Sequence, residues 1–200
     1  MLKNTKKGVL GMIGCVLLAA GRGLRFGENK LLARWEGRTL LDRAIDAIPP
    51  ELQTVAVVSS PETARIAAAR GLPVIRNDRP EDGISRSVRL GTEALPDCEA
   101  ILYLVADQPR LCREGVERVL GLHRDFPDAI CAASSAGKRG NPCLFPRRFF
   151  PELTALEGDR GGSAVIRRHE DCLRLIELPA LQLRDIDTRA DLSALKEELP

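Results

Sequence analysis

A glycine-rich, basic segment lies directly behind the first apolar run of the chain. It alternates three glycines with three cations, namely Gly21, Gly23 and Gly27 with Arg22, Arg25 and Lys30. Glycine lets a backbone approach an anion closely with its N–H groups pointing inward, and nearby cations neutralise phosphate charge. The segment therefore predicts a cradle for a triphosphate, with a purely structural glycine turn as the alternative.

Two better-known phosphate loops do not fit this segment. A dinucleotide-binding loop needs the spacing GxGxxG, whereas the three glycines give GxGxxxG, and Ser59 and Ser60 rather than an acid end the second apolar run. A Walker loop needs Lys and then Ser or Thr directly after its last glycine, but Glu28 follows Gly27. An NAD-dependent oxidoreductase and a P-loop NTPase both lose support.

Carboxylates stand at the ends of two other apolar runs. Asp107 follows residues 101–105, and a carboxylate at the end of a central parallel strand, beside a triphosphate, is placed to hold Mg²⁺. Asp185 and Asp187 alternate along a second run, which would put both on one side of a strand. The structural alternatives are a turn ahead of Pro109 for Asp107 and helix N-capping for Asp187.

Apolar runs alternate with helical patterns along the chain. The expected strands are residues 13–18, 54–58, 73–75, 100–105, 129–133, 173–178 and 182–186, and the expected helices are 40–48, 61–70, 85–94, 113–123, 162–169 and 189–199. Apolar residues at successive strand positions indicate burial on both faces, so the pattern predicts a three-layer α/β fold with a mostly parallel sheet. Ligands bind such sheets beyond the carboxyl ends of the strands. We therefore expect the site in loops 76–84, 134–143 and 157–162.

Length and composition predict one ordinary globular domain. The 200 residues are 44% hydrophobic and 29% charged, with a net charge of +2 and 4% aromatic residues. That balance argues against disorder and against a nucleic-acid binder, which usually carries a strong basic excess on one face. We expect residues 1–11 to form a flexible tail and residues 12–200 to form a single domain, with Met12 as an alternative start.

The N-terminal segment imitates a signal peptide. Three lysines precede an uncharged run over residues 9–21, which is shorter than the roughly 20 apolar residues that span a bilayer. Cleavage would remove the best candidate for a central strand, so we expect a cytoplasmic protein with no membrane partner. The six cysteines form no CxxC pair, and we expect them to be reduced thiols that are buried as small hydrophobes.

Six segments, in register from Ile13 to Leu195, resemble the signatures of one family. The first is Leu18-Ala19-Ala20-Gly21 with Arg25, Gly27 and Lys30, which resembles the signature LAAGxxxRxGxxK. Residues 82–88 resemble a GMSSS-like base-binding segment, and residues 106–109 resemble the ADQP metal motif. Residues 140–142 and 158–162 resemble a GHP and GDxGAR pair, and residues 185–188 resemble the DIDT element. The family is that of the molybdopterin-cofactor nucleotidyltransferases. The likeness is greatest to the molybdenum cofactor cytidylyltransferases.

The resemblance implies a Rossmann-like nucleotidyltransferase fold and a Mg²⁺-dependent reaction. A phosphate of molybdopterin would attack the α-phosphorus of CTP, CMP would be transferred, and pyrophosphate would leave. The implied catalytic residues are Arg25, Lys30 and Asp107, with Asp107 and Asp187 as metal ligands and with Asp185 as the alternative second ligand. The implied nucleotide-binding residues are Leu18, Ala19, Ala20, Gly21, Arg22, Gly23, Ser85 and Ser87, and the acceptor-binding residues are Asn141, Asp159, Arg160 and Gly161.

No general base is required, because a phosphate monoester is already ionised at neutral pH. The absence of a convincing catalytic histidine in the sequence agrees with this. His123 and His169 stand at the ends of expected helices, where a cation complements the helix dipole.

The most detailed inference concerns which nucleobase and which acceptor the enzyme uses. In the resembling families LAAG accompanies cytidylyl transfer and LAGG accompanies guanylyl transfer, so Ala20 favours CTP. Two positions depart from the family pattern, because Arg86 stands where a small residue is usual and Asn141 stands where His is usual.

Three alternatives remain beside cytidylyl transfer to molybdopterin. Two are enzymes of the same fold, which would transfer a guanylyl group to molybdopterin or a cytidylyl group to a sugar or polyol phosphate. The third is a molybdopterin-binding carrier that docks on a molybdoenzyme without catalysis. A carrier has no need of a triphosphate cradle together with a metal carboxylate, which argues against it. A recipient molybdoenzyme is a candidate partner in either case.

Overall fold

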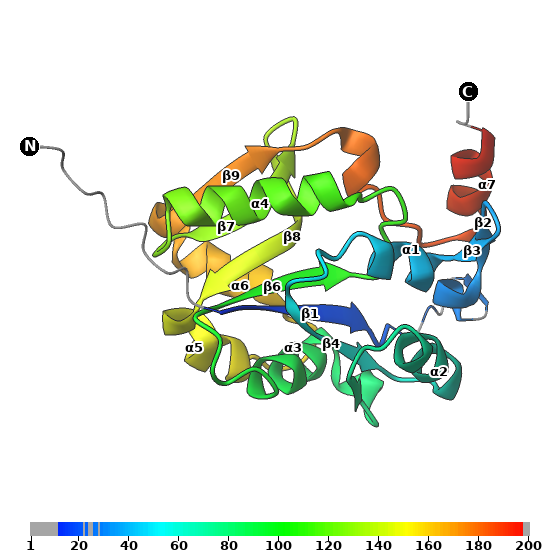
Figure 1. The fold of residues 1–200 in the computed structure, drawn as a ribbon, viewed down its shortest axis with the longest axis horizontal. Coiled ribbons are helices and arrows are strands. Elements are labelled where there is room, and N and C mark those ends of the chain that lie inside the picture. Colours follow the sequence, from blue (N-terminus) through cyan, green and yellow to red (C-terminus); the bar gives the residue numbers. More distant parts are fainter. Residues whose placement is uncertain (1–11, 22, 24–25, 28, 198–200) are drawn as a thin grey trace, which may run out of the picture.

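A seven-stranded sheet forms the centre of the molecule (Figure 1). The computed structural model describes residues 12–21, 23, 26–27 and 29–197, so the expected tail over residues 1–11 lies outside the described part. In spatial order the strands are β5 (Val74–Arg76), β4 (Gln53–Val58), β1 (Ile13–Ala19), β6 (Ala100–Val105), β8 (Lys138–Pro146), β7 (Ile130–Ser135) and β9 (Leu173–Glu177). Only β8 runs antiparallel to its neighbours, which confirms a mostly parallel sheet.

The central strands are buried on both faces, as their unbroken apolar sequences predict. Five of the six residues of β6 and five of the six residues of β4 are buried. The edge strand β9 has no fully buried residue. Because a parallel strand in mid-sheet is covered by helices on both sides, it has no solvent face that could carry polar residues.

Helices cover both faces of the sheet. Helices α1 (Leu40–Asp46), α2 (Pro61–Ala69) and α4 (Arg113–Asp125) contribute to one buried cluster, and α3 (Ile84–Glu93), α5 (Phe150–Thr154) and α6 (Gly162–Arg168) contribute to the other. Figure 1 shows α1 and α4 on one side of the strands and α3 and α5 on the opposite side. The three-layer α/β prediction is therefore confirmed. In the part of the chain that the structure describes, no helix is long and apolar enough to cross a membrane.

A third, smaller cluster joins residues from the segment after β1 to residues near the end of the described chain. Helix α7 (Arg189–Glu197) packs through Leu192 and Leu195 against Trp35 of a short hairpin, which consists of β2 (Arg34–Trp35) and β3 (Arg38–Thr39). Ile186, which precedes α7, is fully buried in the same cluster. This packing fixes the segment that carries Asp185 and Asp187 close to the segment that follows β1.

Two expected elements are wrong. The expected loop 134–143 contains the turn at Ala136 and the first half of β8, which continues to Pro146 and pairs with both β6 and β7. Gly140 and Pro142 are unusual in a strand interior, so this strand has no clear signal in the sequence. The expected strand 182–186 does not form, because a 3₁₀ helix occupies Ala180–Leu183.

The expected roles of the cysteines and histidines need partial correction. All six cysteines are free, but Cys112 is exposed and Cys172 is half-buried, so burial holds only for the other four. His123 does lie in the last turn of α4, but it is buried, and burial lowers its pKa. His123 is therefore a neutral core residue at neutral pH and not a dipole-compensating cation. His169 does follow the end of α6, where its Nε2 lies 2.6 Å from a carboxylate oxygen of Glu152.

Gly83 allows a close contact between two loops that border the carboxyl edge of the sheet. It has a φ of +87°, and a Cβ at this position would lie 2.4 Å from the carbonyl oxygen of Gly158. The amide of Ser85 donates to that same carbonyl at 3.3 Å. The start of α3 is thereby joined to the loop before α6. The two expected ligand loops 76–84 and 157–162 meet at this contact.

We expect Gly83→Ala to lower the free energy of unfolding by about 1–3 kcal/mol, because it combines a strained φ with a backbone clash. Urea denaturation measures the change. The matched control is Gly121→Ala in α4, where nothing lies within 4 Å of the added methyl and where alanine should raise the free energy of unfolding by about 0.5–1 kcal/mol. Equal denaturation midpoints for the two variants would contradict the close contact.

Candidate active site

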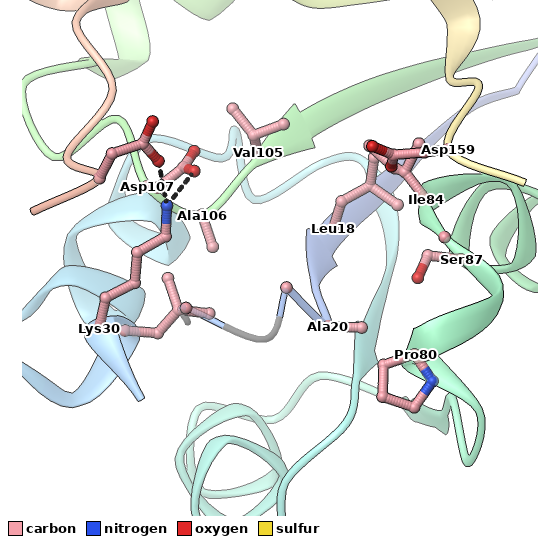
Figure 2. A pocket seen from close by; sticks show the side chains of 15 residues that line it. Leu18, Ala20, Lys30, Pro80, Ile84, Ser87, Val105, Ala106, Asp107 and Asp159 are labelled. Carbon is pink, nitrogen blue, oxygen red and sulfur yellow. Dashed lines mark hydrogen bonds and ion pairs between the residues drawn. The ribbon is translucent and has the colours of Figure 1, made fainter. Parts of the chain in front are cut away.

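A cleft of about 570 Å³ opens at the carboxyl ends of β1 and β6, where the expected ligand loops meet. Figure 2 shows its lining. One end carries Lys30, Asp107 and Asp187. The other end is mostly apolar, with the hydroxyl of Ser87 and the carboxylate of Asp159, and its further lining is Leu18, Ala20, Pro80, Gly83 and Ile84. The remaining lining residues are Gly21, Gly23, Leu31, Val105 and Ala106.

Lys30 connects two carboxylates at the charged end. Its Nζ lies 2.8 Å from Oδ2 of Asp107 and 2.9 Å from Oδ1 of Asp187. Only 8% of the residue is exposed. Asn29 caps the short 3₁₀ helix Lys30–Leu32 with its Oδ1 and donates from Nδ2 to the hydroxyl of Ser60, which anchors the start of this helix on the segment after β4.

Asp107 is positioned by backbone contacts on both sides. The amide of Ala106 donates to the carbonyl of Leu18, and the carbonyl of Asp107 accepts from the amide of Ile186 at 2.9 Å. Within the described residues, Oδ1 of Asp107 is buried and has no hydrogen-bond partner. Neither oxygen caps a turn or a helix, so the turn alternative for Asp107 does not describe its contacts.

The side chain of Asp187 does not cap helix α7, although its position suggests that role. Thr188 and Asp191 cap the helix instead. Oδ2 of Asp191 accepts from the amides of residues 187 and 188, and Oγ1 of Thr188 accepts from the amide of Asp191. The Asp187 carboxylate extends into the cleft instead. Asp185 has a different partner, because its Oδ1 accepts from Nε2 of Gln108 at 2.9 Å. The two aspartates therefore do not act as one pair on a strand face.

The electrostatics of the charged end follow from these contacts. Burial alone would lower the pKa of Lys30, but the charges and hydrogen bonds of Asp107 and Asp187 outweigh it and raise this pKa. Lys30 is a stable ammonium at neutral pH. Asp185 is an exposed residue, but its carboxyl group is partly desolvated. This desolvation is the larger cause, and the negative charge of Asp107 the smaller cause, of a raised pKa for Asp185.

The donor set at the charged end fits a divalent cation that keeps bound phosphate or water. Asp107 presents a buried, unpartnered carboxylate oxygen, and Asp187 reaches the same ammonium. No group of three or more His, Cys, Asp or Glu surrounds one point among the residues that the structure describes. Two carboxylates completed by phosphate oxygens are the donor set that Mg²⁺ prefers.

The expected nucleotide-binding residues divide into three groups. Leu18, Ala20, Gly21, Gly23 and Ser87 line the cleft. Ala19 and Ser85 are buried beside it and do not line it. Arg22 and the expected catalytic Arg25 lie outside the described residues.

A second cavity of about 320 Å³ adjoins the first and shares Leu18, Ile84, Val105 and Asp159 with it. Of the expected acceptor-binding residues, Asn141, Asp159 and Gly161 line this cavity, whereas Arg160 does not. Tyr103, Arg139 and Ser163 also line it and were not expected from the sequence. Arg139 and Tyr103 come from β8 and β6, and they meet only because β8 inserts beside β6.

Asn77 is a further residue that the sequence did not single out. It is 1% exposed, follows β5 directly, and donates from Nδ2 to the hydroxyl of Ser87 at 3.0 Å. Arg86, which departs from the family pattern, donates from Nε to Oδ1 of Asn77 and pairs with the carboxylate of Asp78. The only signal for Asn77 was its place directly after a strand, in an expected ligand loop.

The sequence matches the MobA-like NTP transferase domain over residues 15–172, a range that includes Lys30 and Asp107. The chain belongs to this family. It is therefore a nucleotidyltransferase enzyme that acts on a nucleoside triphosphate.

Curated members of the wider group are similar over much of the chain. A molybdenum cofactor guanylyltransferase of Rhodopseudomonas palustris is 36% identical over 148 residues, which are 69% of this chain and 69% of that protein. Another from Mesorhizobium japonicum is 29% identical, with 78% and 79% covered. A bifunctional IspD/IspF enzyme of Rhodospirillum rubrum is 34% identical over 66% of this chain, and the match spans only 37% of that longer enzyme.

Solved structures support the same fold at lower identity. Rv0371c from Mycobacterium tuberculosis H37Rv superposes with a TM-score of 0.81 at 24% identity, covering 94% of this chain and 100% of that chain. The same protein has been solved as a complex with manganese, which gives a TM-score of 0.77, also at 24% identity and with 94% and 100% covered.

We expect Lys30→Met to lower the free energy of unfolding by about 1–3 kcal/mol at neutral pH, because the two carboxylates lose their shared partner in a half-buried site. The pKa of Lys30 is raised by folding, so its contribution is complete below the unfolded pKa and is lost as the pH rises through the folded value. Urea denaturation at pH 7 and in the strongly alkaline range should therefore show a difference from the wild type that shrinks with alkali. The control is Asp185→Asn, which should be neutral or slightly stabilising, and an equal loss in that variant would contradict the assignment.

Proposed function

We propose that the protein transfers a nucleoside monophosphate from a nucleoside triphosphate, with CTP preferred, to the phosphate of a molybdopterin-type acceptor. The observation that supports this most is the shared ammonium of Lys30 between Asp107 and Asp187, at one end of a cleft whose other end can hold a base. The names of the curated relatives support the acceptor.

The triphosphate would lie at the charged end of the cleft. Lys30 is the buried cation there, and Gly21 and Gly23 offer a backbone that can approach phosphate oxygens. A positively charged donor held beside the leaving group stabilises the negative charge that develops on pyrophosphate. We propose the same role for Arg25 on the resemblance alone.

Asp107 and Asp187 would hold a divalent cation, Mg²⁺ or Mn²⁺. When bound, such an ion neutralises phosphate charge and orients the α-phosphate. The ion would be held by the buried, unpartnered Oδ1 of Asp107, while Lys30 bonds Oδ2 of the same carboxylate. The carboxylates thereby help to place both cations.

The reaction needs only positioning and charge neutralisation from the chain. An ionised oxygen of the acceptor phosphate attacks the α-phosphorus, a new phosphoanhydride bond forms, and the bond to the β-phosphate oxygen breaks so that pyrophosphate leaves with the electron pair. The acceptor would bind in the second cavity, where Arg139 and Asn141 supply polar contacts and Tyr103 supplies an aromatic wall. The cavities meet at Leu18 and Val105.

The preference for CTP rests on Ala20. This residue is 6% exposed, and its methyl group lines the end of the cleft that is proposed for the base (Figure 2). A glycine there would leave more room for the second ring of a purine. Guanylyl transfer is the second candidate, because five of the similar curated proteins are named molybdenum cofactor guanylyltransferases, two of them as probable ones.

We expect divalent-cation-dependent binding of the nucleotide to require Asp107 and Asp187. Wild-type protein with Mg²⁺ and a nucleotide at about 100 times its Kd should gain about 2.7 kcal/mol of stability, measured by thermal or urea unfolding. Asp107→Asn and Asp187→Asn should lose the part of this gain that depends on the metal, whereas the control Asp185→Asn should keep it. If Asp187→Asn binds as the wild type does and Asp185→Asn fails, Asp185 is the second ligand.

We expect Ala20→Gly to move the nucleotide preference from CTP towards GTP. The ratio of kcat/KM for the two nucleotides should fall by about 10-fold or more, since one steric contact in a pocket is worth roughly 1–3 kcal/mol. The measurement is pyrophosphate release with molybdopterin as acceptor, and Gly121→Ala is the control that should leave the ratio unchanged. A wild-type enzyme that already prefers GTP would replace the first candidate by the second.

A further inference from the structure

The hydroxyl of Ser87 stands at the end of the cleft that is opposite to Lys30 (Figure 2). Ser87 is 4% exposed, and its Oγ lies 3.0 Å from Nδ2 of Asn77. Among the described residues this is the only hydrogen bond of its side chain. A hydroxyl has one hydrogen to donate and can also accept, so the direction of this bond decides what Ser87 can offer to a ligand.

The side-chain amide of Asn77 has only one orientation that satisfies its neighbours. One atom receives two donors, because the amide of Arg79 lies 3.1 Å away and Nε of Arg86 lies 3.0 Å away. Neither donor can accept a hydrogen bond. The atom between them must therefore be the oxygen, and the NH₂ group must face Ser87. Asn77 is 1% exposed, so water does not offer a second arrangement.

The polarity of Ser87 follows from this orientation. Because Asn77 donates to Oγ, the hydroxyl hydrogen of Ser87 cannot point back at Asn77. Within the described residues the Ser87 side chain makes no second hydrogen bond, and it lines the cleft. Ser87 thus keeps its hydroxyl hydrogen free to donate to whatever fills that end of the cleft, while one of its two lone pairs is used by Asn77.

We propose that Asn77 is a positioning residue that fixes Ser87 as a donor to an acceptor atom of the nucleobase. This inference rests on the proposed function, because it needs a base at that end of the cleft. Ring nitrogens and carbonyl oxygens of the base satisfy Ser87, namely N3 and O2 of cytosine or O6 and N7 of guanine. An exocyclic amine offers no acceptor for this hydrogen, so it does not use the donor that Asn77 leaves free.

Arg86 gains a role in the same arrangement. Its guanidinium bonds Oδ1 of Asn77 and pairs with Asp78, and a second nitrogen lies 3.9 Å from Asp82. It is thereby directed at the amide rather than at phosphate. The departure of Arg86 from the family pattern reinforces the orientation of Asn77, because the second donor on Oδ1 leaves the amide no alternative.

The test compares binding of a nucleotide with binding of analogues in which one acceptor atom is removed or replaced by sulfur, a weaker acceptor. For CTP these are 3-deaza-CTP and 2-thio-CTP, and for GTP they are 7-deaza-GTP and 6-thio-GTP. Calorimetry on the full chain with Mg²⁺ gives a Kd for each. One analogue should bind the wild type about 3–10-fold more weakly than its parent, which corresponds to one neutral hydrogen bond. The ratio of the Kd of the analogue to the Kd of its parent nucleotide reports that bond alone, because a general loosening of the fold would weaken both ligands equally.

Variants then show which residues produce the difference in Kd between analogue and parent nucleotide. Asn77→Asp keeps an acceptor for Arg79 and Arg86 but cannot donate, so Ser87 must turn its hydrogen towards position 77 and the ratio should fall to about 1. Ser87→Ala should give the same result, and Arg86→Met should give a smaller fall. The control Ser134→Ala removes a buried serine hydroxyl that bonds Glu177 outside the cleft, and it should leave the ratio unchanged.

Three results would overturn the inference, and they differ in what else they remove. If wild-type protein binds no nucleotide with Mg²⁺, the inference and the proposed function fail together. If it binds a nucleotide and no analogue is weakened, Ser87 is not a donor to the base. If Ser87→Ala removes the ratio while Asn77→Asp keeps it, Ser87 reads the base without Asn77. Should Asn77→Asp not fold, a full ratio in Arg86→Met overturns the role of the amide.

Discussion

The ammonium of Lys30, held between the carboxylates of Asp107 and Asp187, is the contact on which the rest of the site depends. Its partners are 77 and 157 positions away along the chain. Bringing three charged groups together at a half-buried point is unfavourable unless their charges match and their hydrogen bonds are made. The fold meets that condition, because each group arrives on a separately anchored segment. A change in any anchor would move one charge away from the other two.

Those anchors are ordinary features of an α/β sheet. β1 and β6 are central neighbours, so the segments after them emerge together at the carboxyl edge. The carbonyl of Asp107 accepts from the amide of Ile186, and burial of Ile186 in the third cluster fixes the final segment against it. Thr188 and Asp191 cap α7, which leaves Asp187 to the cleft. The three charges are therefore positioned mainly by backbone bonds and core packing.

The remainder of the cleft is divided by chemistry. Phosphate would be held where charge is concentrated, the base where Ala20 and Ser87 form a narrow, mostly apolar wall, and the acceptor in the adjoining cavity under β8. The contact of Gly83 with Gly158 holds the segments proposed for base and acceptor binding against each other. In the proposed arrangement, specificity for the base would depend on a few atoms, among them the Ser87 hydroxyl whose orientation is fixed by Asn77 and Arg86.

The sequence by itself determined the alternation of buried strands and helices, and it singled out Lys30 and Asp107, which the structure brings together, because those signals are local in period or motif. It did not give β8, since Gly140 and Pro142 hide a strand that only the pairing with β6 and β7 stabilises. It also did not separate Asp187 from Asp185, which differ only in the partners that folding supplies. Asn77 was invisible for the same reason, because its role exists only where Ser87, Arg79 and Arg86 converge on one amide. Contacts between distant segments were decided by the tertiary structure alone, as no local pattern encodes which polar groups will face each other.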